Sequence, residues 1–146
     1  MQPQDRSLPI YEVADKVVAE LGNVGRLVLS APTGSGKTTQ VPQILLDAGC
    51  AGDGQILVLQ PRRLATRLVA LRVAQELGTQ LGQIVGYQTR HESRQGPDTK
   101  ILFLTEGLFL RRLLSNPQLS GIGAVVIDEF HERPIAADLS LGLCRH

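Results

Sequence analysis

The sequence predicts an α/β fold with a mostly parallel sheet and helices on both of its faces. Short, continuous apolar runs, which are typical of strands buried on both faces, alternate along the chain with longer segments of helical pattern. Strand–helix–strand units cross over in a right-handed sense, so this alternation favours parallel strands covered on both sides. The 146 residues suffice for one domain with a buried core.

The strands are expected at the apolar runs of the chain. These runs are 26–31 (RLVLSA), 55–60 (QILVLQ), 83–90 (QIVGYQTR), 100–105 (KILFLT) and 124–130 (AVVIDEF). The loop-like stretch 91–100 carries the breakers Gly96 and Pro97, and no strand is expected there.

The helices are expected in the longer segments between the strands. Their ranges are 11–21, 37–49, 62–78 and 106–116. In the third segment Leu64, Leu68, Leu71 and Leu77 recur near helical spacing, and Gly78 is a plausible stop. Pro42 lies early in the second helix, where it is tolerated in the first turn or else produces a kink. The chain stops inside a further helical pattern, so residues 1–146 are expected to be one domain truncated at its C-terminal end.

The composition is that of a soluble globular protein. Apolar residues make up 42% of the chain and charged residues 20%, and no apolar run approaches the length of a membrane span. The N-terminus lacks a secretory pattern, and Cys50 and Cys144 have no ligand-like spacing, so we expect reduced thiols and a cytoplasmic location. No membrane partner is indicated.

Positive charge is concentrated rather than abundant. The net charge is +1, yet twelve of the fifteen basic residues are arginines. Four of them lie in one short segment in which Glu76 is the opposing acid: Arg62, Arg63, Arg67 and Arg72. Arginine suits phosphate oxygens, but a solvated helix face would show the same pattern, so charge alone leaves both interpretations open.

Residues 31–38 (APTGSGKT) fit the phosphate-loop pattern G-x-x-x-x-G-K-[ST], except that Ala31 replaces the first glycine. Gly34 and Gly36 can take positive φ, which lets backbone N–H groups turn toward an anion. The next helix adds the positive end of its dipole. Lys37 would reach the β- and γ-phosphates of a nucleotide, and the Thr38 hydroxyl would bind Mg²⁺.

A second metal ligand is expected at the end of the strand 124–130. Asp128 would hold Mg²⁺ there, where α/β sheets place their ligands. Glu129 would orient and deprotonate the attacking water, although a helix-capping pair is the structural alternative. His131 follows in DEFHER, and a relay that senses the γ-phosphate is its preferred role.

Four segments together resemble the first RecA-like domain of DEAH-box helicases. They are APTGSGKTTQVPQ, QPRRLAT, TEGLFLRRL and DEFHER, and they look closest to the bacterial HrpB-type ATP-dependent helicases. The likeness runs from about residue 8 to the end of the chain. Phe130 replaces the alanine of the DEAH signature, which leaves both carboxylates in place. The resemblance implies a RecA-like P-loop NTPase fold that binds ATP and Mg²⁺.

The resemblance also implies roles for individual residues. The nucleotide motif is matched by Thr33, Gly34, Ser35, Gly36, Lys37, Thr38 and Thr39, and Arg72 matches an arginine that stacks on the base. The metal, water-activating and coupling positions are matched by Asp128, Glu129 and His131. Contacts to the nucleic-acid backbone are implied for Arg62, Arg63, Arg90, Thr105, Glu106 and Gly107.

The resemblance predicts an ATP-dependent helicase that acts on single-stranded nucleic acid. RNA is expected rather than DNA, and this preference depends on the resemblance alone. Few aromatic residues are present, so recognition of the sugar–phosphate backbone is expected rather than base stacking. A second RecA-like domain of the same chain would supply arginine fingers, so the 146 residues alone should hydrolyse ATP hardly at all. A P-loop kinase or other phosphotransferase, and an RNA-binding piece with a vestigial loop, are the alternatives.

Overall fold

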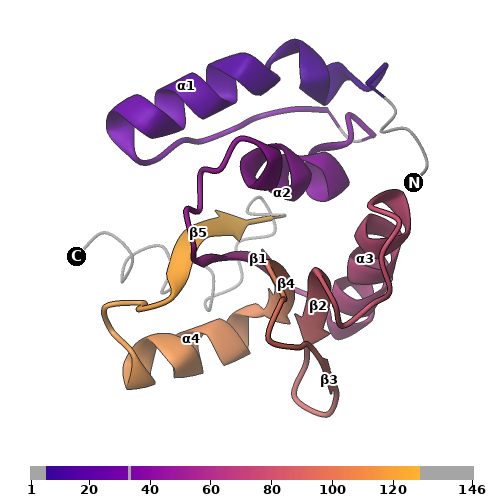
Figure 1. Cartoon of the computed structure of the whole chain (residues 1–146), viewed down its shortest axis with the longest axis vertical. Helices are drawn as coiled ribbons and strands as arrows, with labels where there is room; N and C mark the ends of the chain where they lie inside the picture. Colours follow the sequence, from indigo (N-terminus) through magenta and orange to yellow (C-terminus); the bar gives the residue numbers. More distant parts are fainter. Residues whose placement is uncertain (1–5, 33, 129–146) are drawn as a thin grey trace.

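The computed structural model describes residues 6–32 and 34–128. They form a five-stranded sheet of order β3-β2-β4-β1-β5. Its strands are β1 (Gln55–Gln60), β2 (Val85–Gln88), β3 (Ser93–Arg94), β4 (Ile101–Thr105) and β5 (Ile122–Ile127). All neighbouring pairs are parallel except β2 and β3, which form an antiparallel hairpin at one edge (Figure 1). The predicted α/β fold with a mostly parallel sheet is confirmed.

The helices cover both faces of this sheet. They are the 3₁₀ helix η1 (Pro9–Glu12) and the α-helices α1 (Ala14–Val24), α2 (Lys37–Asp47), α3 (Arg63–Glu76) and α4 (Glu106–Ser115). Helices α2 and α3 contact one face, α4 contacts the other, and α1 packs against α2 and η1 (Figure 1). All four predicted helices are therefore present, with ends shifted by a few residues.

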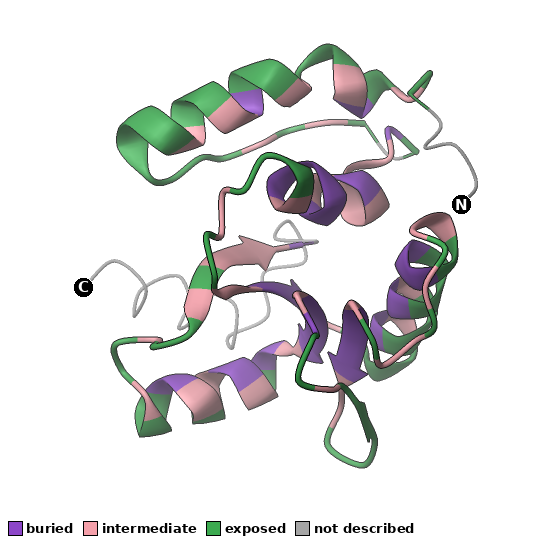
Figure 2. Ribbon diagram, viewed as in Figure 1, coloured by how far each residue is buried: buried purple, intermediate pink, exposed green. Residues whose placement is uncertain are grey.

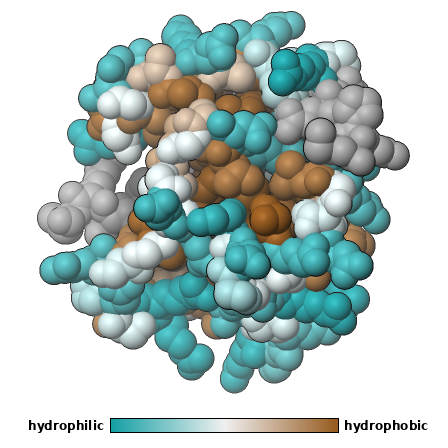
Figure 3. All heavy atoms as spheres, viewed as in Figure 1, coloured by the Kyte–Doolittle hydropathy of each residue, from teal (hydrophilic) through white to brown (hydrophobic). Residues whose placement is uncertain are grey.

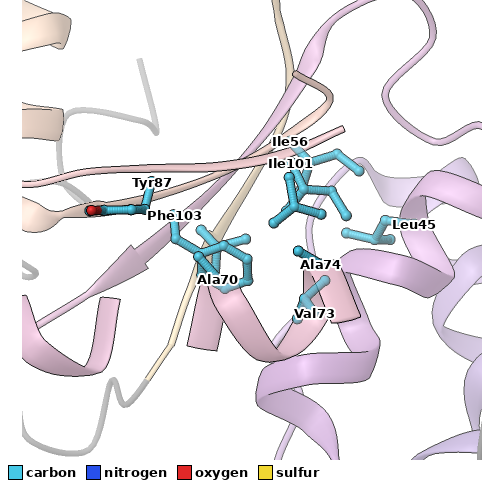
Figure 4. Packing of buried hydrophobic residues seen from close by; sticks show 10 residues of the cluster. Leu45, Ile56, Ala70, Val73, Ala74, Tyr87, Ile101 and Phe103 are labelled. Carbon is cyan, nitrogen blue, oxygen red and sulfur yellow. The ribbon is translucent and has the colours of Figure 1, made fainter. Parts of the chain in front are cut away.

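The core divides into two clusters because side chains alternate between the faces of each strand. Ile56 and Val58 of β1 point toward α2 and α3, with Ile101 and Phe103 of β4 beside them (Figure 4). The intervening residues Leu57, Leu59, Leu102 and Leu104 face α4 and its Phe109. All of these side chains are fully buried, as the central strands in Figure 2 show. Burial on both faces explains why the strands read as continuous apolar runs.

The strand predicted at 26–31 is wrong. The segment is extended but unpaired, and Val28 is 93% exposed. A strand forms only where a neighbour accepts and donates its backbone hydrogen bonds. In the described part of the chain β5 pairs only with β1, and nothing pairs with 26–31. The apolar pattern indicates extended backbone here, but it carries no information about a pairing partner.

Helix α3 buries a different face from the one that its leucines mark. Leu64, Leu68 and Leu71 are exposed, whereas the residues packed on the sheet are small or β-branched. Those residues are Thr66, Ala70, Val73 and Ala74. Small side chains let the helix approach the sheet closely. Gly78 follows the helix at φ 65°, in agreement with the predicted stop.

Two smaller features differ from expectation. The stretch 91–100, expected as a loop, contributes β3, whose Arg94 pairs with Tyr87. Pro42 lies inside α2, beyond its first turn, where its missing N–H leaves one position of the helical ladder unfilled. No helix of the described part is long and apolar enough to cross a membrane. The expected helix near the end of the chain lies outside the described residues.

On the face shown in Figure 3, apolar residues gather in the middle and polar residues surround them. Several large apolar residues are exposed within the described ranges, among them Val24 on α1 and Leu114 on α4. Exposed apolar residues of this kind are normal on a folded domain. The buried core consists of the two clusters on either side of the sheet.

The full burial of Phe103 predicts a large loss of stability on truncation. Phe103→Ala removes a ring packed between the sheet and α3, and should lower the free energy of unfolding by about 3–5 kcal/mol. Leu64→Ala is the matched control, because Leu64 is 72% exposed and should change stability by about 0.5 kcal/mol or less. Urea unfolding of both variants checks this, and equal midpoints would contradict the assigned core.

Candidate nucleotide-binding site

The loop before α2 has the backbone that a phosphate cradle needs. Gly34 has φ 80° and Gly36 has φ 89°, values that other residues adopt only with strain. The helix begins at Lys37, so its first N–H groups and the positive end of its dipole face this loop. Lys37 Nζ donates a hydrogen bond of 2.8 Å to the carbonyl oxygen of Ala31, across the mouth of the loop.

The N-terminal segment holds the loop from outside. Ile10 N donates to the Ser35 carbonyl at 3.2 Å, and Ser35 N donates to the Pro32 carbonyl at 3.2 Å. A Cβ added at Gly36 would lie 2.8 Å from Leu8 Cδ1, so glycine fits there best. Ser35 is buried, and its Oγ has no hydrogen-bond partner within the described residues. The loop is thus tightly packed on one side while a polar group inside it is unsatisfied.

Asp128 is placed by the sheet. It follows β5 directly, is 7% exposed, and its N–H donates to the Leu59 carbonyl at 3.2 Å. Its Oδ2 accepts a hydrogen bond of 2.8 Å from Gln60 Nε2. Sequence reasoning missed Gln60, although a polar residue that ends a buried apolar run is a detectable signal. Gln60 supports the Asp128 carboxylate in its expected position at the end of a strand.

The carboxyl edge of the sheet gathers several other predicted residues. In the register of β1 and β4, Gln60 lies opposite Thr105, and both precede helices. Arg62 and Arg63 follow β1, and both are exposed. Glu106 and Gly107 open α4, where Glu106 is buried and Gly107 is exposed. The residues assigned to nucleic-acid contact therefore extend along the same edge as Asp128.

Two further arginines belong to the predicted set. Arg90 is exposed in the turn that follows β2, and because β2 is parallel to β4 this turn lies at the same carboxyl edge, on the side of the sheet away from β5. Arg72 is on α3, and its Nε donates to Glu76 Oε1 at 2.7 Å. The Arg72 side chain is exposed, and this hydrogen bond connects it to a polar cluster between α3 and α2.

That polar cluster connects α3 to α2 and η1. Glu76 Oε2 accepts hydrogen bonds of 2.8 Å from both Gln40 Nε2 and Gln43 Nε2. Tyr11 Oη donates to Gln40 Oε1 at 2.7 Å. Burial raises the pKa of Glu76, but hydrogen bonds from Arg72, Gln43 and Gln40 outweigh it, so the pKa lies below its ordinary value. Glu76 is consequently a carboxylate at neutral pH.

Three predicted site residues, Thr33, Glu129 and His131, lie outside the described residues. Within the described ranges no group of three or more His, Cys, Asp or Glu side chains could hold a metal. Mg²⁺, however, is commonly bound by one or two protein oxygen ligands together with substrate phosphates and water. The Thr38 hydroxyl and the Asp128 carboxylate are hard oxygen donors of that kind, so their chemistry fits Mg²⁺.

The fold and the loop together define the class of protein to which the chain belongs. A mostly parallel α/β sheet, with a Gly-x-Gly-Lys-Thr turn that opens a helix, is the arrangement of the phosphate-loop proteins. The chain belongs to the DEAD/DEAH box helicase family, which matches residues 11–133.

Individual relatives agree with this assignment. The chain is 43% identical over 99% of its length to the mouse ATP-dependent RNA helicase DHX33, of which it covers 21%. It is 44% identical over 94% of its length to the ATP-dependent RNA helicase HrpB of Escherichia coli strain K12, of which it covers 17%. The crystal structure of Escherichia coli DEAH/RHA helicase HrpB matches with a TM-score of 0.89 over 94% of this chain and 17% of that chain.

These matches confirm the predicted family and its RecA-like fold. Both relatives are helicases, and no finding supports the kinase alternative. The chain spans about a fifth of the length of these relatives.

Substitution by alanine should have opposite effects on stability at Gly36, which lies in the loop, and at Gly22, which lies in α1. Gly36→Ala should lower the free energy of unfolding by about 1–2 kcal/mol, because φ 89° is strained for any side chain and the new Cβ would meet Leu8. Gly22→Ala is the matched control: it lies within α1 with open space around it, and should raise stability by about 0.5–1 kcal/mol. Urea unfolding of the two variants measures both changes. Equal effects would show that the loop conformation is not required.

Proposed function

We propose that this chain is the ATP-binding domain of a DEAH-box RNA helicase, which couples Mg²⁺-dependent ATP hydrolysis to movement along, or unwinding of, nucleic acid. The observation that carries the proposal is the family match over residues 11–133 together with a glycine–lysine loop at the start of α2. The relatives are named ATP-dependent RNA helicases, which supports ATP and RNA as the ligands.

The loop would bind the phosphates through backbone and side-chain donors. The N–H groups from Gly34 onward would surround the phosphate oxygens, and the dipole of α2 favours their negative charge. Lys37 would exchange the Ala31 carbonyl for the β- and γ-phosphates, whose negative charge attracts the ammonium group more strongly than a neutral carbonyl does. Thr33, Ser35 and Thr39 complete the proposed set. The base would lie against Arg72, which the cluster around Glu76 holds near α2.

Hydrolysis would depend on the residues at the end of β5 and on the start of α2. Thr38 and Asp128 are the proposed Mg²⁺ ligands, and Gln60 fixes the orientation of the Asp128 carboxylate. Bound Mg²⁺ would neutralise charge on the transferred phosphoryl group. Glu129 would accept a proton from the attacking water, and His131 would transmit the state of the γ-phosphate. In this proposal Thr38 and Asp128 bind the metal, Gln60 orients Asp128, and Glu129 accepts the proton.

Nucleic acid would bind along the carboxyl edge of the sheet. Arg62, Arg63 and Arg90 are exposed cations suited to phosphate, and Thr105, Glu106 and Gly107 would add hydroxyl and backbone donors. Such contacts hold the strand without reading its sequence. The proposed partners are therefore single-stranded nucleic acid, RNA in the first place, and a second RecA-like domain. The cytoplasmic location and the single-domain extent 1–146 stay predictions from the sequence.

The proton-accepting role of Glu129 predicts a separation of binding from turnover. In the full-length protein Glu129→Gln should retain ATP binding while lowering RNA-stimulated turnover by about 10²-fold or more, the usual worth of a general base. Glu20→Gln, a charge-matched change at an exposed site on α1, should leave both unchanged. Titration with a fluorescent ATP analogue and a phosphate-release assay measure the two quantities. Turnover retained in Glu129→Gln would refute the assignment, and rapid turnover by residues 1–146 alone would refute the need for a second domain.

The proposed backbone contacts predict a change in salt dependence. Removing one phosphate contact to a single strand should reduce the slope of log affinity against log salt by about 0.7, so Arg62→Ala with Arg63→Ala should reduce it by roughly twice that. Arg26→Ala with Arg111→Ala removes the same charge from exposed positions outside the proposed site. Fluorescence anisotropy with labelled single-stranded RNA at several salt concentrations gives both slopes. If the two double variants share one slope, the contacts are not at Arg62 and Arg63.

A further inference from the structure

Helix α3 ends in a carboxylate that receives three hydrogen bonds from two helices. Glu76 Oε1 accepts from Arg72 Nε at 2.7 Å, within α3. Glu76 Oε2 accepts from Gln40 Nε2 and from Gln43 Nε2, each at 2.8 Å, across the contact with α2. Glu76 lies outside the four segments of the sequence that resemble helicase motifs.

The two glutamines depend on this carboxylate. Gln40 is 2% exposed and Gln43 is fully buried, so their amide N–H groups must find partners inside the protein. An ionised carboxylate is a stronger acceptor than a neutral oxygen, and one oxygen can accept from both amides. Removing it would leave buried donors short of an acceptor, which costs more than the hydrogen bond contributes.

The glutamines carry the constraint into the first turn of α2. Gln40 Nε2 also donates to Thr39 Oγ1 at 2.9 Å, and Gln43 Nε2 donates to the Thr39 carbonyl at 2.9 Å. Gln40 N donates to the Gly36 carbonyl at 2.8 Å. Tyr11 Oη, at 2.7 Å from Gln40 Oε1, fixes the other end of that amide. The turn that follows Gly36 is therefore held through the side chains of Gln40 and Gln43.

We propose that Glu76 is a positioning residue for the phosphate loop: through Gln40 and Gln43 it holds the first turn of α2 in the orientation that binds nucleotide phosphates. The proposal rests on the proposed function, because it concerns the same loop. Glu76 contacts neither the loop glycines nor Lys37 in this network. It acts through residues one helical turn away, so its removal should loosen the loop without deleting a phosphate donor.

Glu76 lies at the opposite end of α3 from the proposed nucleic-acid contact. Helix α3 begins at Arg63, next to Arg62, and ends at Glu76. Its 14 residues span about 21 Å at 1.5 Å per residue. The proposed nucleic-acid contact and the contact of Glu76 with Gln40 and Gln43 thus lie at opposite ends of one helix.

The test uses the full-length protein and two variants that remove either all or some of the interactions of the Glu76 carboxylate. Glu76→Ala removes all three hydrogen bonds. Glu76→Gln keeps one oxygen that can accept from both glutamines but removes the ion pair with Arg72. Glu20→Gln on α1 is the charge-matched control. Hydrogen–deuterium exchange of peptides covering residues 29–40, measured without nucleotide, reports the loop directly.

In Glu76→Ala we expect faster exchange in 29–40, a KM for ATP raised about tenfold or more, and turnover lowered by about 10- to 100-fold, since small displacements of a binding loop have effects of this size. The RNA concentration for half-maximal binding should stay within about twofold, because Arg62 and Arg63 are unchanged. Glu76→Gln should lie between the wild type and Glu76→Ala.

Two results would overturn the proposal. One is unchanged exchange of 29–40 in Glu76→Ala, whatever happens to activity. The other is exchange that rises equally throughout the domain in both Glu76 variants, which would make Glu76 a general stability residue. A wild-type protein without ATPase activity would instead refute the proposed function, while the exchange data would still decide whether Glu76 holds the loop.

Discussion

The parallel register of β1 with its two neighbours is the constraint on which the rest of the structure depends. Leu59 lies opposite Leu104 on one side and Ile127 on the other, so three strands end at one level. Because β1 and β4 are buried on both faces, a slip of one residue would turn their apolar side chains to the wrong layer. The register therefore fixes where the polar residues begin: Gln60, Thr105 and Asp128 occupy one edge because the core beneath them permits no other alignment.

The same constraint explains how far the sequence could predict the fold. Strands β1 and β4 are recognisable as apolar runs because both of their faces are covered, and the half-buried strand β5 is equally apolar in sequence. The predicted helices lie in the intervals between the apolar runs. The segment 26–31 has an equally apolar pattern, yet it forms no strand because pairing is a property of two segments and the pattern describes only one. In α3 the leucines indicate the wrong face, because close packing on the sheet selects small residues such as Ala70 over large ones.

The residues of the candidate site differ in the same way. The positions of Lys37, at the start of α2, and of Asp128, directly after β5, were predictable because they follow from local patterns: a glycine-rich turn before a helix, and an acid at the end of an apolar strand. The sequence marks Gln60 only as a polar residue that ends an apolar run, because its role depends on its neighbour in space, Asp128, which is 68 residues away in the chain. Gln40 and Gln43 were hidden for the same reason. Buried amides become informative only once their partners are known.

The sequence pattern did not indicate that the carboxylate at the end of α3, Glu76, accepts hydrogen bonds from buried amides. From the sequence, Glu76 is one acid among four arginines and would be expected to pair with them on a solvated face. In the structure Arg72 takes only one carboxylate oxygen, and the other accepts hydrogen bonds from two buried amides. A carboxylate that satisfies buried donors is harder to replace than a surface ion pair, which contributes little on its own. Glu76 is therefore half-buried at the contact between α3 and α2, where it holds the two buried amides of α2, while Arg63, at the opposite end of the same helix, is exposed at the surface.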